Sequence, residues 1–237
     1  LQKDGSYLNL SGNQIGAIMA KYILEAHKNA GTLPENAALC KSIVSTDLVT
    51  KIAESYGATM FNVLTGFKFI AEKIQEFEEK HNHTYMMGFE ESFGYLIKPF
   101  VRDKDAIQAV LVVAELAAYY RSRGLTLADG IEEIYKEYGY YAEKTISVTL
   151  SGVDGAEQIK AIMAKFRNNA PKEWNATAIT VVEDFKAQTS TAADGTVTNL
   201  TTPPSDVLKY TLADGSWIAV RPSGTEPKIK FYIAVVG

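Results

Sequence analysis

One short stretch near the carboxyl end, Arg221-Pro222-Ser223-Gly224-Thr225, gathers groups that can bind a phosphate anion. A guanidinium offers a planar pair of donors that matches two phosphate oxygens, and the two hydroxyls add further donors. The glycine lets successive backbone N–H groups form a small concave surface that attracts anions. The same residue types are common in ordinary turns, which is the alternative interpretation. One arginine, two hydroxyls and a glycine within five residues favour an anion site in this segment, the arginine loop (residues 221–225).

A second stretch, Glu90-Glu91-Ser92-Phe93-Gly94, places two carboxylates and a serine directly after an apolar run. Carboxylate oxygens accept hydrogen bonds from neighbouring hydroxyls, so this pattern suits a polyol ligand. A nucleophilic serine is less favoured because no histidine stands near it. On spacing alone, a solvated acidic loop is equally compatible with the pattern. We call this segment the acidic loop (residues 90–94).

A third stretch, Arg102-Asp103-Lys104-Asp105, precedes a long apolar pattern that predicts a helix. Either aspartate could cap that helix by accepting hydrogen bonds from its first N–H groups. Lys104 could instead point at a ligand. By itself this signal is weak.

Helix and strand patterns alternate through residues 11–138 and would position the acidic loop. Ser11 can cap a first helix, and strand-like runs cover residues 39–44, 59–63 and 85–89. This order predicts a mixed, largely parallel α/β domain. Ligands of such sheets collect at loops after the carboxyl ends of strands, which here are the loops after Val63 and Phe89. Further helices are predicted from Ser45-Thr46-Asp47 to Gly57, after Thr65-Gly66, and over residues 105–123 and 126–138.

The pattern changes after Gly139. One helical pattern over residues 156–168 is followed by strand-like segments at 179–183, 207–212, 217–220 and 229–235. Asp214-Gly215 is a strong hairpin signal between two of them. This predicts a smaller α+β domain with a mainly antiparallel sheet. Residues 187–204, rich in Thr, Ser, Ala and Asp, are expected to form a solvated loop.

Composition narrows the possible classes of protein. The 237 residues are 46% hydrophobic and 22% charged, which excludes disorder for most of the chain. The net charge of −4 gives no general reason to bind nucleic acid or an anionic membrane. No apolar run approaches the roughly 20 residues of a membrane span. The single cysteine, Cys40, cannot form an internal disulfide and is predicted to be a buried hydrophobe.

The N-terminal sequence starts at Leu1, with neither an initiator methionine nor a signal-peptide pattern. We therefore expect the chain to be the interior part of a longer polypeptide in the cytoplasm.

The three stretches together resemble the α-D-phosphohexomutase superfamily, which contains the phosphoglucomutases and phosphomannomutases. The acidic loop resembles the sugar-recognition loop of the family's third domain, and the arginine loop resembles the phosphate-binding loop of its fourth. Thr65-Gly66-Phe67-Lys68 resembles another active-site loop of the third domain, and Lys104 falls in its Arg-x-Lys-Asp stretch. The order and spacing match over nearly the whole chain. The Glu-Glu-Ser-Phe-Gly form is closer to phosphoglucomutases than to phosphomannomutases.

The resemblance implies a role for each matching residue. Glu90 and Ser92 would bind sugar hydroxyls, with Thr65 and Gly66 lining the same pocket. The phosphate that is not being transferred would be held by Arg221, Ser223, Gly224 and Thr225, with help from Lys230. Lys104 would contact the sugar or its transferring phosphate. Ala106, where some members have Gly, leaves the direction of Lys104 open. No metal ligands are implied within this sequence.

The resemblance also implies what lies outside these residues. The family's phosphoserine loop and its aspartate-rich magnesium loop do not occur in this sequence. Residues 1–9 would be the tail of a preceding domain, residues 10–138 the third domain and residues 139–237 the fourth. The complete enzyme would interconvert glucose 1-phosphate and glucose 6-phosphate, with Mg²⁺ and glucose 1,6-bisphosphate as cofactors. This half alone would be inactive, and its partners would be sugar phosphates and the N-terminal domains of the same polypeptide.

Several rival functions share these motifs. A phosphomannomutase, a phosphohexosamine mutase or a phosphopentomutase would carry both loops. A sugar-phosphate-binding module without catalysis is the alternative from another class.

Overall fold

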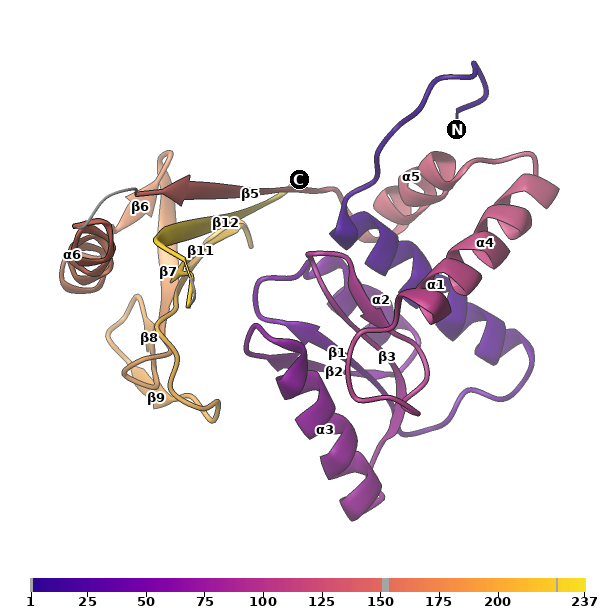
Figure 1. Cartoon of the computed structure of the whole chain (residues 1–237), viewed down its shortest axis with the longest axis horizontal. Coiled ribbons are helices and arrows are strands. Elements are labelled where there is room, and N and C mark those ends of the chain that lie inside the picture. Colours follow the sequence, from indigo (N-terminus) through magenta and orange to yellow (C-terminus); the bar gives the residue numbers. More distant parts are fainter. Residues whose placement is uncertain (1, 151–153, 225) are drawn as a thin grey trace. The chain divides into compact units, whose positions relative to one another are not determined.

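The computed structural model describes residues 2–150, 154–224 and 226–237. Backbone contacts divide the chain into two units, Leu1–Tyr140 (unit 1) and Tyr141–Gly237 (unit 2) (Figure 1). Each unit is described separately below.

Unit 1 alternates helices with strands and ends in two helices. Its elements, in chain order, are α1 (Gly12–Asn29), β1 (Ala37–Ser42), α2 (Leu48–Ser55), β2 (Thr59–Val63), α3 (Phe67–Lys80), β3 (Thr84–Glu90), β4 (Gly94–Leu96), α4 (Ala106–Ser122) and α5 (Leu127–Tyr138).

The sheet of unit 1 has the strand order β2-β1-β3-β4. Strand β1 pairs in parallel with both β2 and β3, whereas β4 returns antiparallel to β3. Helix α3 covers one face of this sheet and α1 the other (Figure 1). Helices α2 and α5 pack against α1, and α4 contacts α1, α5 and strand β4. This architecture confirms the mixed, largely parallel α/β fold expected from the sequence.

Side-chain caps define where several helices of unit 1 begin. Ser11 Oγ accepts the Gln14 N–H, and the Gln14 side chain accepts the Ser11 N–H, which forms a capping box before α1. Asp105 accepts the N–H groups of Ile107 and Gln108 at the start of α4. Asp105, of the two aspartates considered, is therefore the cap of that helix. Such caps stabilise a helix by about 1 kcal/mol each.

The core of unit 1 lies between the sheet and its helices. Cys40, in the middle of β1, is completely buried in a cluster with residues such as Ile70 and Phe77 of α3. Burial raises the pKa of the Cys40 thiol to about 12, which leaves it protonated and unreactive at neutral pH. Cys40 is thus a structural hydrophobe, as the sequence predicts.

Unit 2 contains one long helix and a series of strands. Its elements are β5 (Tyr141–Thr149), α6 (Gly155–Asn168), β6 (Glu173–Trp174), β7 (Thr177–Asp184), β8 (Thr189–Ala192), β9 (Val197–Asn199), β10 (Leu208–Leu212), β11 (Trp217–Pro222) and β12 (Lys228–Val236).

The sheet of unit 2 has the order β5-β12-β11-β10-β7-β8-β9, and each of these neighbouring pairs is antiparallel. Helix α6 packs on one face, where Ile159 and Met163 meet apolar side chains such as Ile218 and Val220 of β11. The Asp214-Gly215 turn joins β10 to β11, with Gly215 at φ 86°. The expected α+β domain with a mainly antiparallel sheet is therefore present.

The expectation that residues 187–204 form a solvated loop is wrong as to the loop. Strands β8 and β9 lie in this segment, and β8 extends the sheet beside β7. Their side chains are half-buried or exposed, so neither strand carries the apolar alternation by which a strand is detected.

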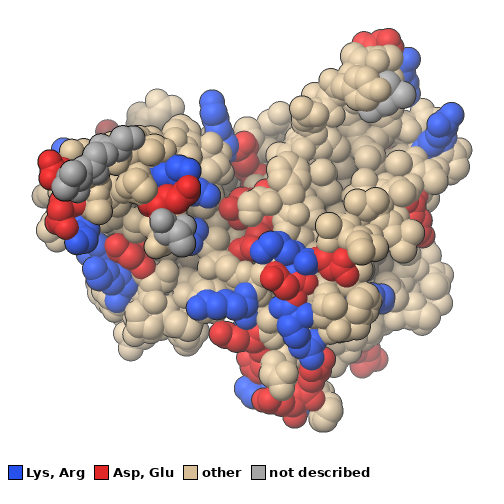
Figure 2. Space-filling model, in the orientation of Figure 1, with Lys and Arg blue, Asp and Glu red and all other residues tan. Residues whose placement is uncertain are grey.

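On the face shown in Figure 2, basic and acidic side chains lie interspersed over the described residues. Among those residues, no helix combines the length and the apolar character needed to cross a membrane.

Candidate functional site

The polar loops of unit 1 meet at one edge of its sheet. Because β1, β2 and β3 run parallel, their carboxyl ends lie at the same edge. The turn after β1, the Thr65-Gly66 loop after β2 and the acidic loop after β3 therefore share that edge. This is where open parallel sheets bind ligands.

Glu90 is the last residue of β3, and its side chain is directed into this edge. Only 6% of the residue is exposed, and its Oε1 accepts the backbone N–H of Gly66 at 2.7 Å. Among the described residues, no hydrogen bond to the other oxygen, Oε2, is present. A buried carboxylate with one oxygen held by a backbone donor and the other available is a rigid acceptor for a hydroxyl ligand.

Lys104 and Gly94 lie beside that carboxylate. A Cβ atom at Gly94 would stand 3.1 Å from Lys104 Cδ and 3.7 Å from Glu90 Oε2, so the glycine lets both side chains approach. The Lys104 side chain is about half exposed, and its Nζ lies 3.4 Å from Asp103 Oδ1 and 5.8 Å from the centre of the Phe67 ring. The structure thus brings Glu90, Gly66 and Lys104 close to one another.

Thr65 and Ser92 are placed differently from each other. The Thr65 hydroxyl is buried and has no hydrogen-bond partner among the described residues. Ser92 is exposed in the turn between β3 and β4. The next residue, Phe93, has a φ of 63°, a strained value for a side chain other than glycine.

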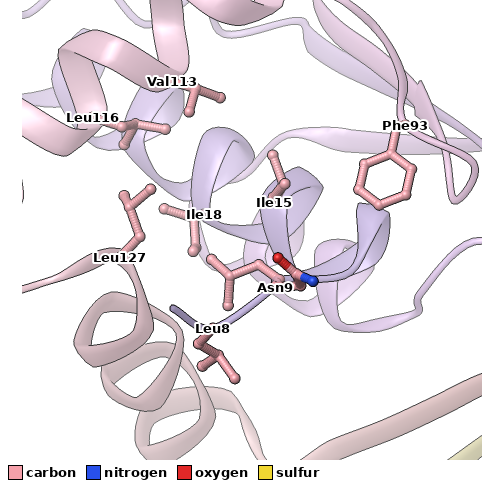
Figure 3. A pocket seen from close by; sticks show the side chains of 9 residues that line it. Leu8, Asn9, Ile15, Ile18, Phe93, Val113, Leu116 and Leu127 are labelled. Carbon is pink, nitrogen blue, oxygen red and sulfur yellow. The ribbon is translucent and has the colours of Figure 1, made fainter. Parts of the chain in front are cut away.

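The Phe93 ring lies beside an apolar hollow of about 450 Å³ (Figure 3). Ile15 and Ile18 of α1, Leu116 of α4 and Leu127 of α5 line this hollow. The turn that carries Ser92 is therefore flanked by apolar surface on its Phe93 side.

The alternative of a solvated acidic loop does not hold for these two carboxylates, because Glu90 is buried and Glu91 is half-buried. They also contact different partners. Glu91 Oε2 is 3.2 Å from Ser42 Oγ in the turn after β1.

Lys41 is a buried residue that the sequence interpretation missed. Its side chain is 0% exposed, and its Nζ donates to Asp47 Oδ1 at 2.8 Å and to the Ser45 carbonyl oxygen at 3.1 Å. The sequence signal that could have identified Lys41 is a lysine inside the apolar run of residues 37–44. This ion pair fixes the turn against which the acidic loop packs.

The arginine loop joins β11 to β12 in unit 2. Arg221 and Lys230 occupy directly opposite positions on the two strands, so both side chains leave the same face of the sheet. Neither side chain forms an ion pair or a hydrogen bond with another described residue. Like charges directly opposite each other destabilise a strand pair. An anion between them would remove this repulsion.

The rest of the arginine loop is partly exposed. Ser223 donates its N–H to the Lys228 carbonyl oxygen at 2.7 Å, which closes the loop. Gly224 is exposed, and a Cβ there would meet no atom within 4 Å. Thr225 lies outside the described residues.

A hollow of about 420 Å³ adjoins the loop, lined by Pro222 and Ser223 and by Ile159 of α6. It lies on the α6 side of the sheet. Arg221 and Lys230 alternate with Val220 and Ile229, which pack toward α6, so the two cations belong to the opposite face. This hollow is therefore separate from the cation pair.

The described residues contain no cluster of three His, Cys, Asp or Glu side chains that could hold a metal ion.

Comparison with known families confirms the resemblance. Residues 11–138 match the family described as phosphoglucomutase/phosphomannomutase, alpha/beta/alpha domain III. Residues 154–235 match phosphoglucomutase/phosphomannomutase, C-terminal domain.

Similar proteins agree in sequence and in fold. A phosphoglucomutase from Staphylococcus aureus (strain bovine RF122 / ET3-1) is 38% identical over 98% of this chain and 41% of its own length. The phosphoglucomutase parafusin from Paramecium, in its open form, has a TM-score of 0.63 at 17% identity, covering 96% of this chain and 37% of that one. An N-acetylphosphoglucosamine mutase from Aspergillus fumigatus, solved with glucose 1,6-bisphosphate, has a TM-score of 0.51 at 12% identity. The match covers 100% of this chain and 42% of that one.

The chain spans about two fifths of the length of the curated relatives that it matches. The domain III match precedes the C-terminal domain match along the chain, and together the two matches cover most of the 237 residues. The chain therefore belongs to the phosphoglucomutase/phosphomannomutase family and carries its domain III and its C-terminal domain.

Proposed function

We propose that this chain is the sugar- and phosphate-binding half of a phosphoglucomutase that interconverts glucose 1-phosphate and glucose 6-phosphate. The observation that carries the proposal is the Arg221–Lys230 pair, two cations side by side with no anionic partner among the described residues. Together they match the charge of a phosphate dianion. Ser223 and Gly224, with Thr225, would complete the site through hydroxyl and backbone N–H donors.

The sugar is proposed to bind at the carboxyl edge of the unit 1 sheet. Glu90 Oε2 would accept a sugar hydroxyl while Oε1 stays on the Gly66 N–H. The unpartnered hydroxyl of Thr65 supports a polar ligand there, since an unsatisfied buried hydroxyl is costly. Ser92 would add a hydroxyl from the exposed side of the loop, and Lys104 would contact the sugar or its transferring phosphate.

Phosphoryl transfer depends mainly on positioning and on stabilisation of charge. In this proposal the chain positions the substrate, while the serine that carries the phosphoryl group and the Mg²⁺ ligands belong to the N-terminal part that the longer relatives possess. The chain alone would then be inactive. Glucose 1,6-bisphosphate as an intermediate cofactor is supported by its presence in the related A. fumigatus structure.

Replacing Arg221 by alanine is expected to weaken binding of glucose 6-phosphate by about 1.5–3 kcal/mol, the scale of a hydrogen bond to a charged group. Isothermal titration calorimetry on the 237-residue chain measures this change.

The matched control for Arg221→Ala is Lys172→Ala. It also removes one positive charge from unit 2, but from an exposed residue beside β6, near the strand ends opposite the arginine loop. We expect the control to bind as the unchanged chain does. Equal affinities for all three proteins would show that the arginine loop is only a turn.

A further inference from the structure

The two adjacent carboxylates of the acidic loop have separate partners. Glu90 accepts the Gly66 N–H from the loop after β2. Glu91 instead faces the turn after β1, where its Oε2 lies 3.2 Å from Ser42 Oγ and 3.5 Å from Ser45 Oγ. The Glu91 backbone N–H donates to Ser45 Oγ at 3.1 Å. Glu91 therefore contacts the same turn through both its backbone and its side chain.

Counting leaves two ways to place the hydroxyl protons of this cluster, and the shorter contact of Ser42 with Glu91 Oε2 favours one of them. Ser42 Oγ and Ser45 Oγ are 2.8 Å apart, and each hydroxyl has one proton to donate. Ser45 Oγ accepts from Glu91 N–H and donates to Ser42 Oγ. Ser42 Oγ then donates to Glu91 Oε2, the shorter of the two carboxylate contacts. Every proton is used once, and the path begins and ends on Glu91.

We propose that this closed ring makes Glu91 a positioning residue, which holds the acidic loop so that the neighbouring Glu90 is aimed at the sugar. The inference rests on the proposed function for the role of Glu90, whereas the ring itself does not. Ser42 and Ser45 are both 0% exposed, so a ligand does not reach their hydroxyls. Burying them without partners would be costly, and the ring satisfies both.

The position of the ring explains how it could act on Glu90. Glu90 ends β3 and Glu91 is the next residue, so fixing the Glu91 backbone and side chain limits the rotation available to the preceding peptide. The turn that receives Glu91 is itself held by the Asn13 side chain, whose Oδ1 accepts the Thr46 N–H at 3.1 Å. The acidic loop is thus hydrogen-bonded to the turn after β1, and that turn is hydrogen-bonded to α1.

If Glu91 positions the loop, one set of variants should lose sugar-phosphate binding, and if Glu91 binds the sugar itself, a different set should lose it. Glutamine keeps a carbonyl oxygen that can accept from Ser42, so Glu91→Gln retains the ring, whereas Glu91→Ala opens it. Ser42→Ala also opens the ring, although this residue contacts no ligand. If Glu91 bound the sugar through its charge, Glu91→Gln would be harmful and Ser42→Ala would not.

The first measurement is amide hydrogen exchange by NMR on the unliganded 237-residue chain. Ser42→Ala is expected to speed exchange of the Glu91 N–H roughly tenfold or more, even though the bond of that N–H is to Ser45. Glu91→Gln should leave the rate at residue 91 close to that of the unchanged chain. The control is Ser216→Ala, which removes a buried serine hydroxyl from unit 2 and should not alter exchange at Glu91.

The second measurement is titration with glucose 6-phosphate. We expect Ser42→Ala and Glu91→Ala to weaken binding several-fold, the double variant to weaken it no further, and Glu91→Gln to bind normally. Glu90→Gln should weaken binding at least as much as Ser42→Ala. Urea unfolding of each variant shows whether unit 1 stays folded at the temperature of the titration.

The outcomes separate the ring from the proposed function. Unchanged exchange at Glu91 in a folded Ser42→Ala variant would overturn the ring. Normal exchange but weakened binding in Glu91→Gln would make Glu91 a sugar-binding residue and overturn the positioning role. If the unchanged chain binds no glucose 6-phosphate while exchange follows the expected pattern, the proposed function fails and the ring stands.

Discussion

Replacing Asp47 by asparagine is expected to lower the free energy of unfolding of unit 1 by about 3 kcal/mol. The Lys41 ammonium is fully buried and has Asp47 as its counter-charge at 2.8 Å, whereas the Asp47 side chain is 36% exposed. Asparagine keeps the shape and one acceptor oxygen but leaves the buried charge uncompensated. We expect a loss of unfolding free energy at the lower end of the range measured for broken buried ion pairs, because water reaches the Asp47 carboxylate.

Urea unfolding with two probes measures this change within one protein. Far-ultraviolet circular dichroism follows mainly unit 1, which carries α1 to α5, and tryptophan fluorescence follows unit 2, which carries Trp174 and Trp217. The unit 2 transition should not move.

Two further variants test the cause of the Asp47→Asn effect. The double variant Lys41→Met/Asp47→Asn should recover most of the lost stability, because no buried charge remains. Glu133→Gln breaks an exposed pair with Arg123 in the same unit and should cost less than about 1 kcal/mol. If Asp47→Asn costs no more than Glu133→Gln, the buried pair does not stabilise the turn after β1.

Gly12→Ala is expected to destabilise unit 1 by about 3 kcal/mol, at the upper end of the range for overpacked sites. A Cβ at Gly12 would lie 2.0 Å from the Glu91 carbonyl oxygen and 3.0 Å from the Phe93 N, both backbone atoms of the acidic loop. Helix α1 cannot move away from the acidic loop without breaking a hydrogen bond, because the Tyr95 hydroxyl donates to the Gly12 carbonyl oxygen at 2.8 Å. Either α1 or the acidic loop must shift.

The same two-probe unfolding experiment measures the Gly12→Ala effect. Gly224→Ala is its stability control, since a Cβ there meets nothing within 4 Å and its φ is not in the left-handed region. We expect the control to stay within about 0.5 kcal/mol of the unchanged chain. A Gly12→Ala protein as stable as that control would mean that α1 and the acidic loop are not in close contact.

Local signals predicted much of the fold because they act within a few residues. Ser11 followed by Gln14 forms the expected cap, and Asp214-Gly215 forms the expected hairpin turn. The alternation of strand and helix in residues 11–138 also sufficed to place the acidic loop at the carboxyl edge of a parallel sheet. These features depend on local hydrogen bonds and on hydrophobic periodicity.

Strands β8 and β9 were missed because their stability comes from a neighbour. Thr189 and Thr191 are β-branched, but both faces of the strand are partly open, so no apolar alternation appears. The signal that was available is Asp194-Gly195, the same dipeptide as in the recognised hairpin. Gly195 has a φ of 87°, and β8 pairs with β9 around it.

The candidate site was only partly predictable for a related reason. Residue types and spacing identified Glu90 and Arg221, but they did not separate Glu90 from Glu91. That difference depends on Ser42 and Ser45, which lie more than forty residues away in the sequence. The pairing of Arg221 with Lys230 likewise depends on the register of β11 and β12.

The central proposal is that the acidic loop binds sugar hydroxyls and that the arginine loop binds phosphate. The most direct test is an NMR titration of the isotope-labelled 237-residue chain with glucose 6-phosphate, with sulfate in a parallel experiment. We expect glucose 6-phosphate to shift the amide signals of Gly66, Glu91, Ser92, Ser223 and Gly224, with a dissociation constant near millimolar, about −4 kcal/mol. Sulfate should shift only the signals of the arginine loop. If glucose 6-phosphate at tens of millimolar leaves the signals of both loops in place, the account is wrong.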